Sequence, residues 1–343
     1  MPNVINVIIT AILGLFYKNL NMEERTKKRI YLMVIGVCLT FVSGFRGLYA
    51  LSDTEAYFST FKGSFQYTLF EQFHINVVDF GFYCVTWILA HTGMSWQLYL
   101  LIYSAFVFGS VLYWIYDNSQ DVVVSLLIFE CLFLNVWQCA LRQTMAMAII
   151  LWVYKLLKCN KKLWAAVLYI VSLTFHATAV IMIPFFIIKN KKISDGIIAT
   201  CTAFTGLFYV FKRQFLSVVN WMANLLGRNV YLEFWKENPI TLIAMCMLVL
   251  FISVILKNII AKRYPQCGEC YFALYLMLIL LALGGGVMVR LAWYYGIFLC
   301  LLIPMICKCF KQELVATLIA CSMLLLLYLP QADLTTYYFC WMN

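Results

Sequence analysis

Residues 30–58, IYLMVIGVCLTFVSGFRGLYALSDTEAYF, decide the fold class. Residues 30–45 form an apolar run without a charged residue, and Arg46, Asp53 and Glu55 follow within ten positions. Apolar runs recur along all 343 residues, of which 64% are hydrophobic and only 12% are charged, whereas a soluble domain carries about 25% charged residues. The sequence therefore predicts a polytopic membrane protein. The predicted class is all-α, because lipid offers the backbone no hydrogen-bond partners.

Basic residues cluster between the apolar runs and predict the topology. The five clusters lie at residues 18–29, 155–162, 189–192, 257–263 and 308–311. Cytoplasmic loops carry an excess of lysine and arginine, so we place all five clusters in the cytoplasm. This arrangement predicts about 12 transmembrane helices in a single integral membrane domain, with both termini outside. It also predicts outer loops at about 46–94 and 212–238.

One apolar run between Arg29 and Lys155 is not expected to cross the membrane, because five runs lie there and the number of crossings must be even. The weakest run is 77–90, which is about 14 residues long and carries Asp79. We expect it to form a short interfacial or re-entrant outer helix. The segment 121–154 lacks Gly and Pro but is too long for one crossing, so it is expected to turn near 135–142.

Arginine is unexpectedly frequent on the predicted outer side, since the orientation rule does not require it there. The five outer arginines are Arg46, Arg142, Arg213, Arg228 and Arg290. The guanidinium group stays charged and binds phosphate or carboxylate through two parallel hydrogen bonds. Arg46, Arg142 and Arg290 lie at the ends of apolar runs, where the alternative is that they anchor helices to headgroups. Their joint presence on the disfavoured side favours an anion site.

Other polar groups lie in the same predicted layer. Asn135, Gln138 and Arg142 have i, i+3 and i+7 spacing and share one face if their helix continues. His176 follows an apolar run, and three glycines precede Arg290, where a loosened backbone could offer N–H groups to an anion. We therefore expect these side chains to contribute to one outer site.

Two further features have both a functional and a structural interpretation. Glu130 lies in the middle of a predicted span, where a carboxyl group is either functional or a protonated structural residue. The pairs Cys267–Cys270 and Cys307–Cys309 have spacings that zinc sites use, but their flanking residues do not resemble a zinc ribbon. Buried structural cysteines are the favoured interpretation, and no metal site is predicted.

Several arginines with a histidine and a carboxylate suit a lipid-linked phosphate or pyrophosphate. A pyrophosphate leaving group gains negative charge, which fixed guanidinium groups stabilise without a metal. An attacking sugar hydroxyl needs a general base, for which Asp53 and His176 are both candidates. The sequence contains neither a GxGxxG nor a Walker motif, so the expected donor is a lipid-linked sugar, with no cofactor and no nucleic-acid partner.

The order of motifs resembles the EpsG family of Wzy-like polysaccharide polymerases, over roughly residues 40–340. The matching stretches are FRG…SDTEAY, VDFGFY, LRQTMAMAIILW, FHATAVIMIPFF and VRLAWYYGIFLCLLIP. The most specific parts are the pair Arg142-Gln143 and the pair Phe175-His176. Asp79 stands where the family more often has glutamate, and the resemblance assigns it no role.

The resemblance implies polymerisation of undecaprenyl-pyrophosphate-linked oligosaccharide repeat units into capsular, exo- or O-antigen polysaccharide, at the outer face of the bacterial cytoplasmic membrane. A chain-length regulator protein is a candidate partner. An O-antigen ligase or another lipid-linked-sugar glycosyltransferase is the first alternative, and a flippase or transporter for the same lipids is the second. The implied catalytic residues are Asp53, His176 and Arg142, and the implied substrate-binding residues are Arg46, Tyr57, Gln143 and Arg290.

Overall fold

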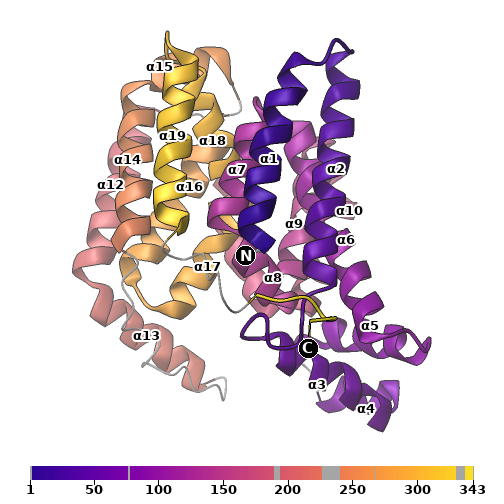
Figure 1. Cartoon of the computed structure of the whole chain (residues 1–343). Coiled ribbons are helices and arrows are strands. Elements are labelled where there is room, and N and C mark those ends of the chain that lie inside the picture. Colours follow the sequence, from indigo (N-terminus) through magenta and orange to yellow (C-terminus); the bar gives the residue numbers. More distant parts are fainter. Residues whose placement is uncertain are drawn as a thin grey trace. The chain divides into compact units, whose positions relative to one another are not determined.

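The computed structural model describes residues 2–75, 78–188, 194–225, 240–265, 267–329 and 337–342 (Figure 1). Within these ranges every regular element is a helix, and extended pairing is limited to one isolated antiparallel bridge between Arg46 and Phe339. The all-α prediction is therefore confirmed. The chain forms two compact units, Met1–Val180 with Ile319–Asn343, and Ile181–Leu318.

Within its described part the first unit contains ten complete α-helices and the part of α19 (Glu313–Tyr328) that begins at Ile319. The complete helices are α1 (Pro2–Asn19), α2 (Glu24–Gly44), α3 (Thr54–Gly63), α4 (Leu69–Ile75), α5 (Phe80–His91), α6 (Trp96–Asn118), α7 (Val122–Leu132), α8 (Leu134–Cys139), α9 (Leu141–Lys158) and α10 (Lys162–Phe175). Helix α2 packs on α6, and α9 packs on both α6 and α10. The interior is apolar, as Phe108 of α6 and Phe129 of α7 are fully buried in ring contact.

The segment 121–154 is broken twice, at Phe133 and at Ala140 (φ −89°, ψ 68°). The turn expected near 135–142 is therefore present. The helix does not continue from Asn135 to Arg142, so the condition for a common face of Asn135, Gln138 and Arg142 is not met. The break turns Gln138 toward α2, where its Nε2 donates to Ser43 Oγ at 2.7 Å.

The lysine-rich helix ends of the first unit gather at one end of it. The start of α2 meets the end of α6, which also meets the end of α9. The contacts are Arg29 Nε to Tyr116 Oη (3.3 Å), Lys155 Nζ to Asp117 Oδ2 (2.8 Å) and Lys158 Nζ to Asn118 Oδ1 (2.7 Å). The other ends of these helices lie at the opposite end of the unit, where α3, α4 and α5 gather (Figure 1). Two of the predicted basic clusters thus share one end, as the topology requires.

Helix α16 occupies the centre of the second unit and is buried along most of its length. The described α-helices of the second unit are α11 (Ile183–Ile188), α12 (Asp195–Val210), α13 (Lys212–Leu225), α14 (Ile240–Ile255), α15 (Lys257–Arg263), α16 (Cys267–Leu283), α17 (Gly286–Gly296), α18 (Leu299–Cys307) and the start of α19 (Glu313–Tyr328). Gly284 (φ 77°) and Gly285 (φ 84°) separate α16 from α17 in the left-handed region that glycine adopts most readily. These are two of the glycines that were predicted to loosen the backbone before Arg290.

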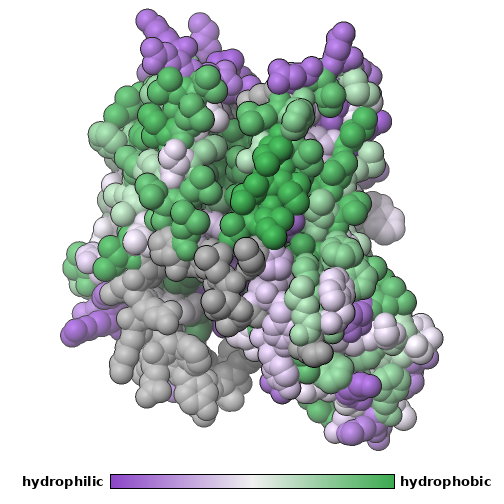
Figure 2. Space-filling model, in the orientation of Figure 1, coloured by the Kyte–Doolittle hydropathy of each residue, from purple (hydrophilic) through white to green (hydrophobic). Residues whose placement is uncertain are grey.

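One helix in the described ranges, α6, is long and apolar enough to span a membrane, and up to three spans result if two bent pairs each count as one. These pairs are α14 with α15, bent by 75°, and α17 with α18, bent by 56°. The predicted count of about 12 transmembrane helices is not confirmed, because the breaks leave shorter apolar helices of 10–17 residues. Hydrophobic side chains nevertheless cover the middle of the first unit, with hydrophilic ones toward its ends (Figure 2).

The predicted outer segments are partly described. The short helix expected at 77–90 is α5, whose 12 residues are fewer than the roughly 20 that a crossing needs. The first half of the loop expected at 212–238 is α13, an amphipathic helix. The rest of that loop, with Arg228, and the basic cluster 189–192 lie outside the described residues.

Candidate functional site

Asp79 is the centre of a polar cluster at the end of the first unit opposite the lysines. Its Oδ2 accepts a hydrogen bond from Arg142 Nη1 at 3.1 Å and lies 3.1 Å from His176 Nδ1. Its Oδ1 accepts a hydrogen bond from the backbone N–H of Ala177 at 3.0 Å. The carboxylate is only 6% exposed. It therefore joins the start of α5, the start of α9 and the end of α10.

Local backbone geometry allows these segments to meet. Asp79 has a positive φ of 63°, which is uncommon for a residue other than glycine. His176 is extended (φ −158°, ψ 116°) and so ends α10. A Cβ atom on Gly81 would lie 2.2 Å from Thr174 Oγ1, so only glycine lets α5 approach α10 this closely. The glycine of the VDFGFY stretch therefore allows the close packing of α5 on α10.

The charge state of Asp79 follows from its partners. Burial acts to raise its pKa, but the hydrogen bond and charge of His176, the Ala177 N–H and the charge of Arg142 together lower the pKa below its usual value. The carboxylate is therefore ionised at neutral pH and accepts the proton on His176 Nδ1. In a neutral imidazole a proton on Nδ1 leaves Nε2 as the acceptor nitrogen, and the His176 side chain is 23% exposed.

Two tyrosines also interact with Arg142. Its Nη1 also donates to Tyr83 Oη at 3.4 Å, and its guanidinium lies 6.0 Å from the centre of the Tyr83 ring. Tyr57 of α3 interacts with it as well: burial raises the pKa of Tyr57, and the charge and hydrogen bond of Arg142 oppose that rise. The Arg142 side chain stays 36% exposed.

Arg46 is buried rather than exposed at the surface of an outer loop. It is 1% exposed, and it donates from Nη1 to the Ser43 carbonyl at 2.7 Å and from Nε to Thr54 Oγ1 at 3.2 Å. Its Nη2 has no hydrogen-bond partner, and no carboxylate pairs with it among the residues that the structure describes. Burial lowers the pKa of this guanidinium. A buried cation without a counter-ion is costly, so Arg46 is a candidate anion-binding group.

The segment 337–342 holds Arg46 in place and has no counterpart in the predicted site. The Gly47 N–H donates to the Tyr338 carbonyl at 2.8 Å, and the Cys340 N–H donates to the Phe45 carbonyl at 2.9 Å. A Cβ on Gly47 would lie 2.0 Å from the Tyr338 ring, so the two backbones meet closely. The aromatic residues near position 340 were the one sequence feature of this segment, and they did not indicate that it pairs with the chain around Arg46.

The family model described as EpsG family matches residues 29–340. The chain belongs to the EpsG family. Membership points to a polymerase-like, glycosyltransferase-type function in polysaccharide synthesis, and the apolar helices agree with a membrane protein. Neither the curated proteins nor the solved structures gave a match.

In this EpsG-family protein, the three remaining predicted site residues, namely Asp53, Gln143 and Arg290, belong to different segments of the chain. Asp53 precedes α3, is partly buried, and in the described structure its one side-chain hydrogen bond comes from Ser52 Oγ at 3.3 Å. Its charge acts on Tyr57, which links it electrostatically to the Arg142 side of the cluster. Gln143 is buried on α9, and Arg290 is an exposed residue of α17 in the second unit.

Two features of the EpsG-family protein stand apart from this cluster. Glu130 is buried between α7 and α1, where its Oε1 accepts a hydrogen bond from Thr10 Oγ1 at 2.6 Å. The described ranges contain no group of three or more His, Cys, Asp or Glu side chains that could hold a metal ion. Cys267 and Cys270 are buried in the first turn of α16, so a structural role is the better interpretation of this pair.

Proposed function

We propose that the protein polymerises undecaprenyl-pyrophosphate-linked repeat units into a polysaccharide at the outer face of the bacterial cytoplasmic membrane, and that the Asp79 cluster is its catalytic site. The observation that carries this proposal is the convergence of Arg142 and His176 on one buried carboxylate. It brings a base and an anion-binding cation together at the end of the first unit that is opposite its lysines. EpsG-family membership supports the polymer-forming chemistry.

His176 is the better candidate for the general base than Asp53. Asp79 fixes one ring nitrogen of His176, which leaves Nε2 to accept a proton from a sugar hydroxyl. The same carboxylate then stabilises the imidazolium ion that forms, as in other aspartate–histidine pairs. Asp53 has no comparable partner in the described structure. We therefore assign Asp53 to the surroundings of Tyr57 and the proton transfer to His176.

The proposed step is a glycosyl transfer. A hydroxyl oxygen of the incoming unit bonds to the anomeric carbon of the growing chain, and its proton moves to His176 Nε2. The bond from that carbon to the pyrophosphate oxygen breaks, and undecaprenyl pyrophosphate leaves with the bonding electrons. Arg142 uses one nitrogen on Asp79 and Tyr83 and also bonds Tyr57, and the N–H groups that remain can stabilise the leaving pyrophosphate.

Arg46 supplies a second donor in this proposal. Its unpartnered Nη2 is the type of preorganised group that stabilises developing negative charge. Tyr57 interacts electrostatically with both Arg46 and Arg142. This supports a substrate-binding role for Tyr57 between the two cations. Gln143 and Arg290 stay candidate substrate-binding residues on the strength of the resemblance.

Reconstitution of the purified chain with a synthetic undecaprenyl-pyrophosphate repeat unit tests the proposal. The wild type is expected to give a ladder of polymers by gel electrophoresis and mass spectrometry. Arg142→Lys is expected to stay in the membrane but to give much shorter chains, because lysine is a point charge without the planar fork. Arg213→Lys, at an exposed arginine of α13, is the matched control. Normal polymer from Arg142→Ala would remove Arg142 from the site.

The products also separate the alternative activities. A ligase adds finished chains to an acceptor without extending them, so a product of unchanged repeat number would favour it. A flippase needs two compartments, whereas a polymerase works in detergent micelles. Chain growth in detergent would therefore exclude transport as the sole activity.

A further inference from the structure

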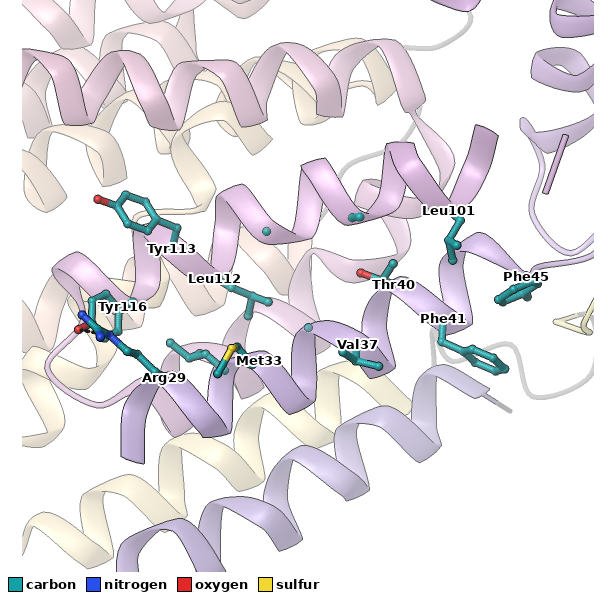
Figure 3. Close-up of a pocket in the computed structure, with 14 residues that line it drawn as sticks. Arg29, Met33, Val37, Thr40, Phe41, Phe45, Leu101, Leu112, Tyr113 and Tyr116 are labelled. Atoms are coloured by element: carbon teal, nitrogen blue, oxygen red, sulfur yellow. Dashed lines mark hydrogen bonds between the residues drawn. The ribbon is translucent and has the colours of Figure 1, made fainter. Parts of the chain in front are cut away.

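A long apolar groove lies between α2 and α6 in the first unit (Figure 3). Its volume is about 880 Å³. Three small residues line it, namely Gly36 on α2 and Ala105 and Gly109 on α6. A Cβ on Gly36 would meet Leu112 at 2.6 Å, whereas the space above Gly109 is open. Met33 and Val37 line it with exposed side chains. Because α6 is the described helix best suited by length and composition to cross a membrane, we expect this apolar surface to face lipid.

The groove is long enough for an acyl chain. On α2 its lining extends from Arg29 to Phe45, which is about 24 Å at 1.5 Å per helical residue. One leaflet contributes about 15 Å to the hydrocarbon core of a bilayer. A chain that enters at one end therefore reaches Gly109 and continues between the two helices. No atom lies within 4 Å of a Cβ built on Gly109, so the space above it is open to a ligand.

One end of the groove carries a cation and the other does not. Arg29 is the one charged side chain among the described lining residues, and Figure 3 shows it beside Tyr116, with Phe45 at the far end. Its Nε donates to Tyr116 Oη at 3.3 Å, and its guanidinium lies 5.8 Å from the centre of the Tyr116 ring. Within the described ranges no carboxylate pairs with Arg29. Its terminal nitrogens are thus held at the groove without a protein anion.

We propose that this groove binds an anionic glycerophospholipid, with the phosphate on Arg29 and one acyl chain along Gly36, Ala105 and Gly109. The charge of the site favours an anionic headgroup, since basic residues beside a cytoplasmic leaflet attract anionic lipids. The acyl chain fills space that the small residues leave between α2 and α6. The site lies at the lysine-rich end and does not depend on the proposed polymerase activity. The lipid would stabilise the helix pair whose opposite end carries Arg46.

Native mass spectrometry of the full chain, titrated with phosphatidylglycerol or phosphatidylcholine of identical acyl chains, tests the site. We expect phosphatidylglycerol to bind more tightly by about fivefold, which is the effect of one basic residue beside an anionic surface. Arg29→Gln should abolish this preference. Arg25→Gln removes an exposed arginine one turn earlier that does not line the groove, so it should keep the preference. Gly109→Leu should weaken binding of both lipids by tenfold or more, because the side chain fills the groove.

Gly206→Leu is the matched control for the groove variant, because it too is a helical glycine whose added Cβ meets nothing within 4 Å. It should leave lipid binding unchanged. Equal affinity for the two lipids, an equal loss in Arg25→Gln and Arg29→Gln, or undiminished binding in Gly109→Leu would each overturn the proposal. So would the finding, by lipid extraction from the wild type, that the bound lipid is neutral or a polyprenyl phosphate. Unchanged helix content by circular dichroism verifies that each variant is folded. If Gly109→Leu does not fold, the lipid preference of Arg29→Gln alone tests the proposal.

Discussion

Nδ1 of His176 lies 3.1 Å from Oδ2 of Asp79, although 97 residues separate the two in the chain. The contact joins the first residue after α10 to the residue before α5. The same oxygen accepts a hydrogen bond from Arg142, so one carboxylate orients both groups that the proposed chemistry needs. In the proposed site Asp79 is therefore a positioning residue rather than a ligand of the substrate.

Asp79→Asn is expected to reduce polymerisation by about 10²-fold, because the amide keeps the shape but removes the charge that orients His176 and stabilises its imidazolium ion. The measurement is the initial rate of polymer formation in reconstituted membranes. Glu55→Gln, at an exposed acid of α3, is the control and should keep the wild-type rate. An Asp79→Asn protein as active as the control would show that the carboxylate has no part in catalysis.

The stability that Asp79 confers on the folded protein should decrease as the pH falls. The pKa of Asp79 is lowered in the folded protein by His176, Ala177 and Arg142 against the opposing effect of burial. Its contribution is therefore fully present above the unfolded pKa of about 4 and is lost as the pH falls through the folded pKa. In detergent, the free energy of unfolding of the wild type should exceed that of Asp79→Asn by about 1–3 kcal/mol at pH 5–7. A difference that persists undiminished down to about pH 2 would contradict the ionised state.

His176→Gln should lower the rate by about 10²–10⁴-fold while binding of the lipid-linked substrate is retained, because only the proton acceptor is removed. His91→Gln removes an exposed histidine at the end of α5 and is the matched control. Substrate binding and single-turnover rate should be measured on the same preparations. A loss of binding with an unchanged single-turnover rate would assign His176 to substrate recognition instead.

Arg46→Met should leave the thermal stability unchanged or raise it, while polymer formation falls by tenfold or more. A buried guanidinium without a counter-ion is unfavourable, and an apolar side chain of similar length removes that cost. Differential scanning fluorimetry and the polymerisation assay give the two quantities, with Arg213→Met as the surface control. A destabilised variant with the wild-type specific activity would mean that Arg46 serves the fold alone.

Gly81→Ala should separate Asp79 from His176 and reduce activity, because the new Cβ would lie 2.2 Å from Thr174 Oγ1. We expect a loss of about 1–3 kcal/mol in stability and partial recovery in the double variant with Thr174→Ala. Gly63→Ala, whose Cβ meets nothing within 4 Å, should be neutral. Equal behaviour of Gly81→Ala and Gly63→Ala would show that α5 can move without disturbing the site.

The sequence alone determined the all-α class and the family, because apolar composition and short motifs are properties of the chain itself. It also identified Arg142 and His176 as site candidates, a turn near residues 135–142 and the glycines before Arg290. The expected number of spans is not confirmed, since an apolar run does not show where a helix breaks. Helices end at Phe133 and Ala140 although no Gly or Pro in the segment indicates a break.

Only the tertiary structure decided the contacts of Asp79, the burial of Arg46 and the position of residues 337–342. Each depends on contacts between segments far apart in the chain: Arg142 and Asp79 are separated by 63 residues, and Tyr49 and Tyr338 by 289. Such contacts arise from helix packing, which no local pattern of charge or hydrophobicity specifies. Asp79 was left without a role for this reason, because its three partners come from α9 and from the end of α10, and packing brings them to one carboxylate.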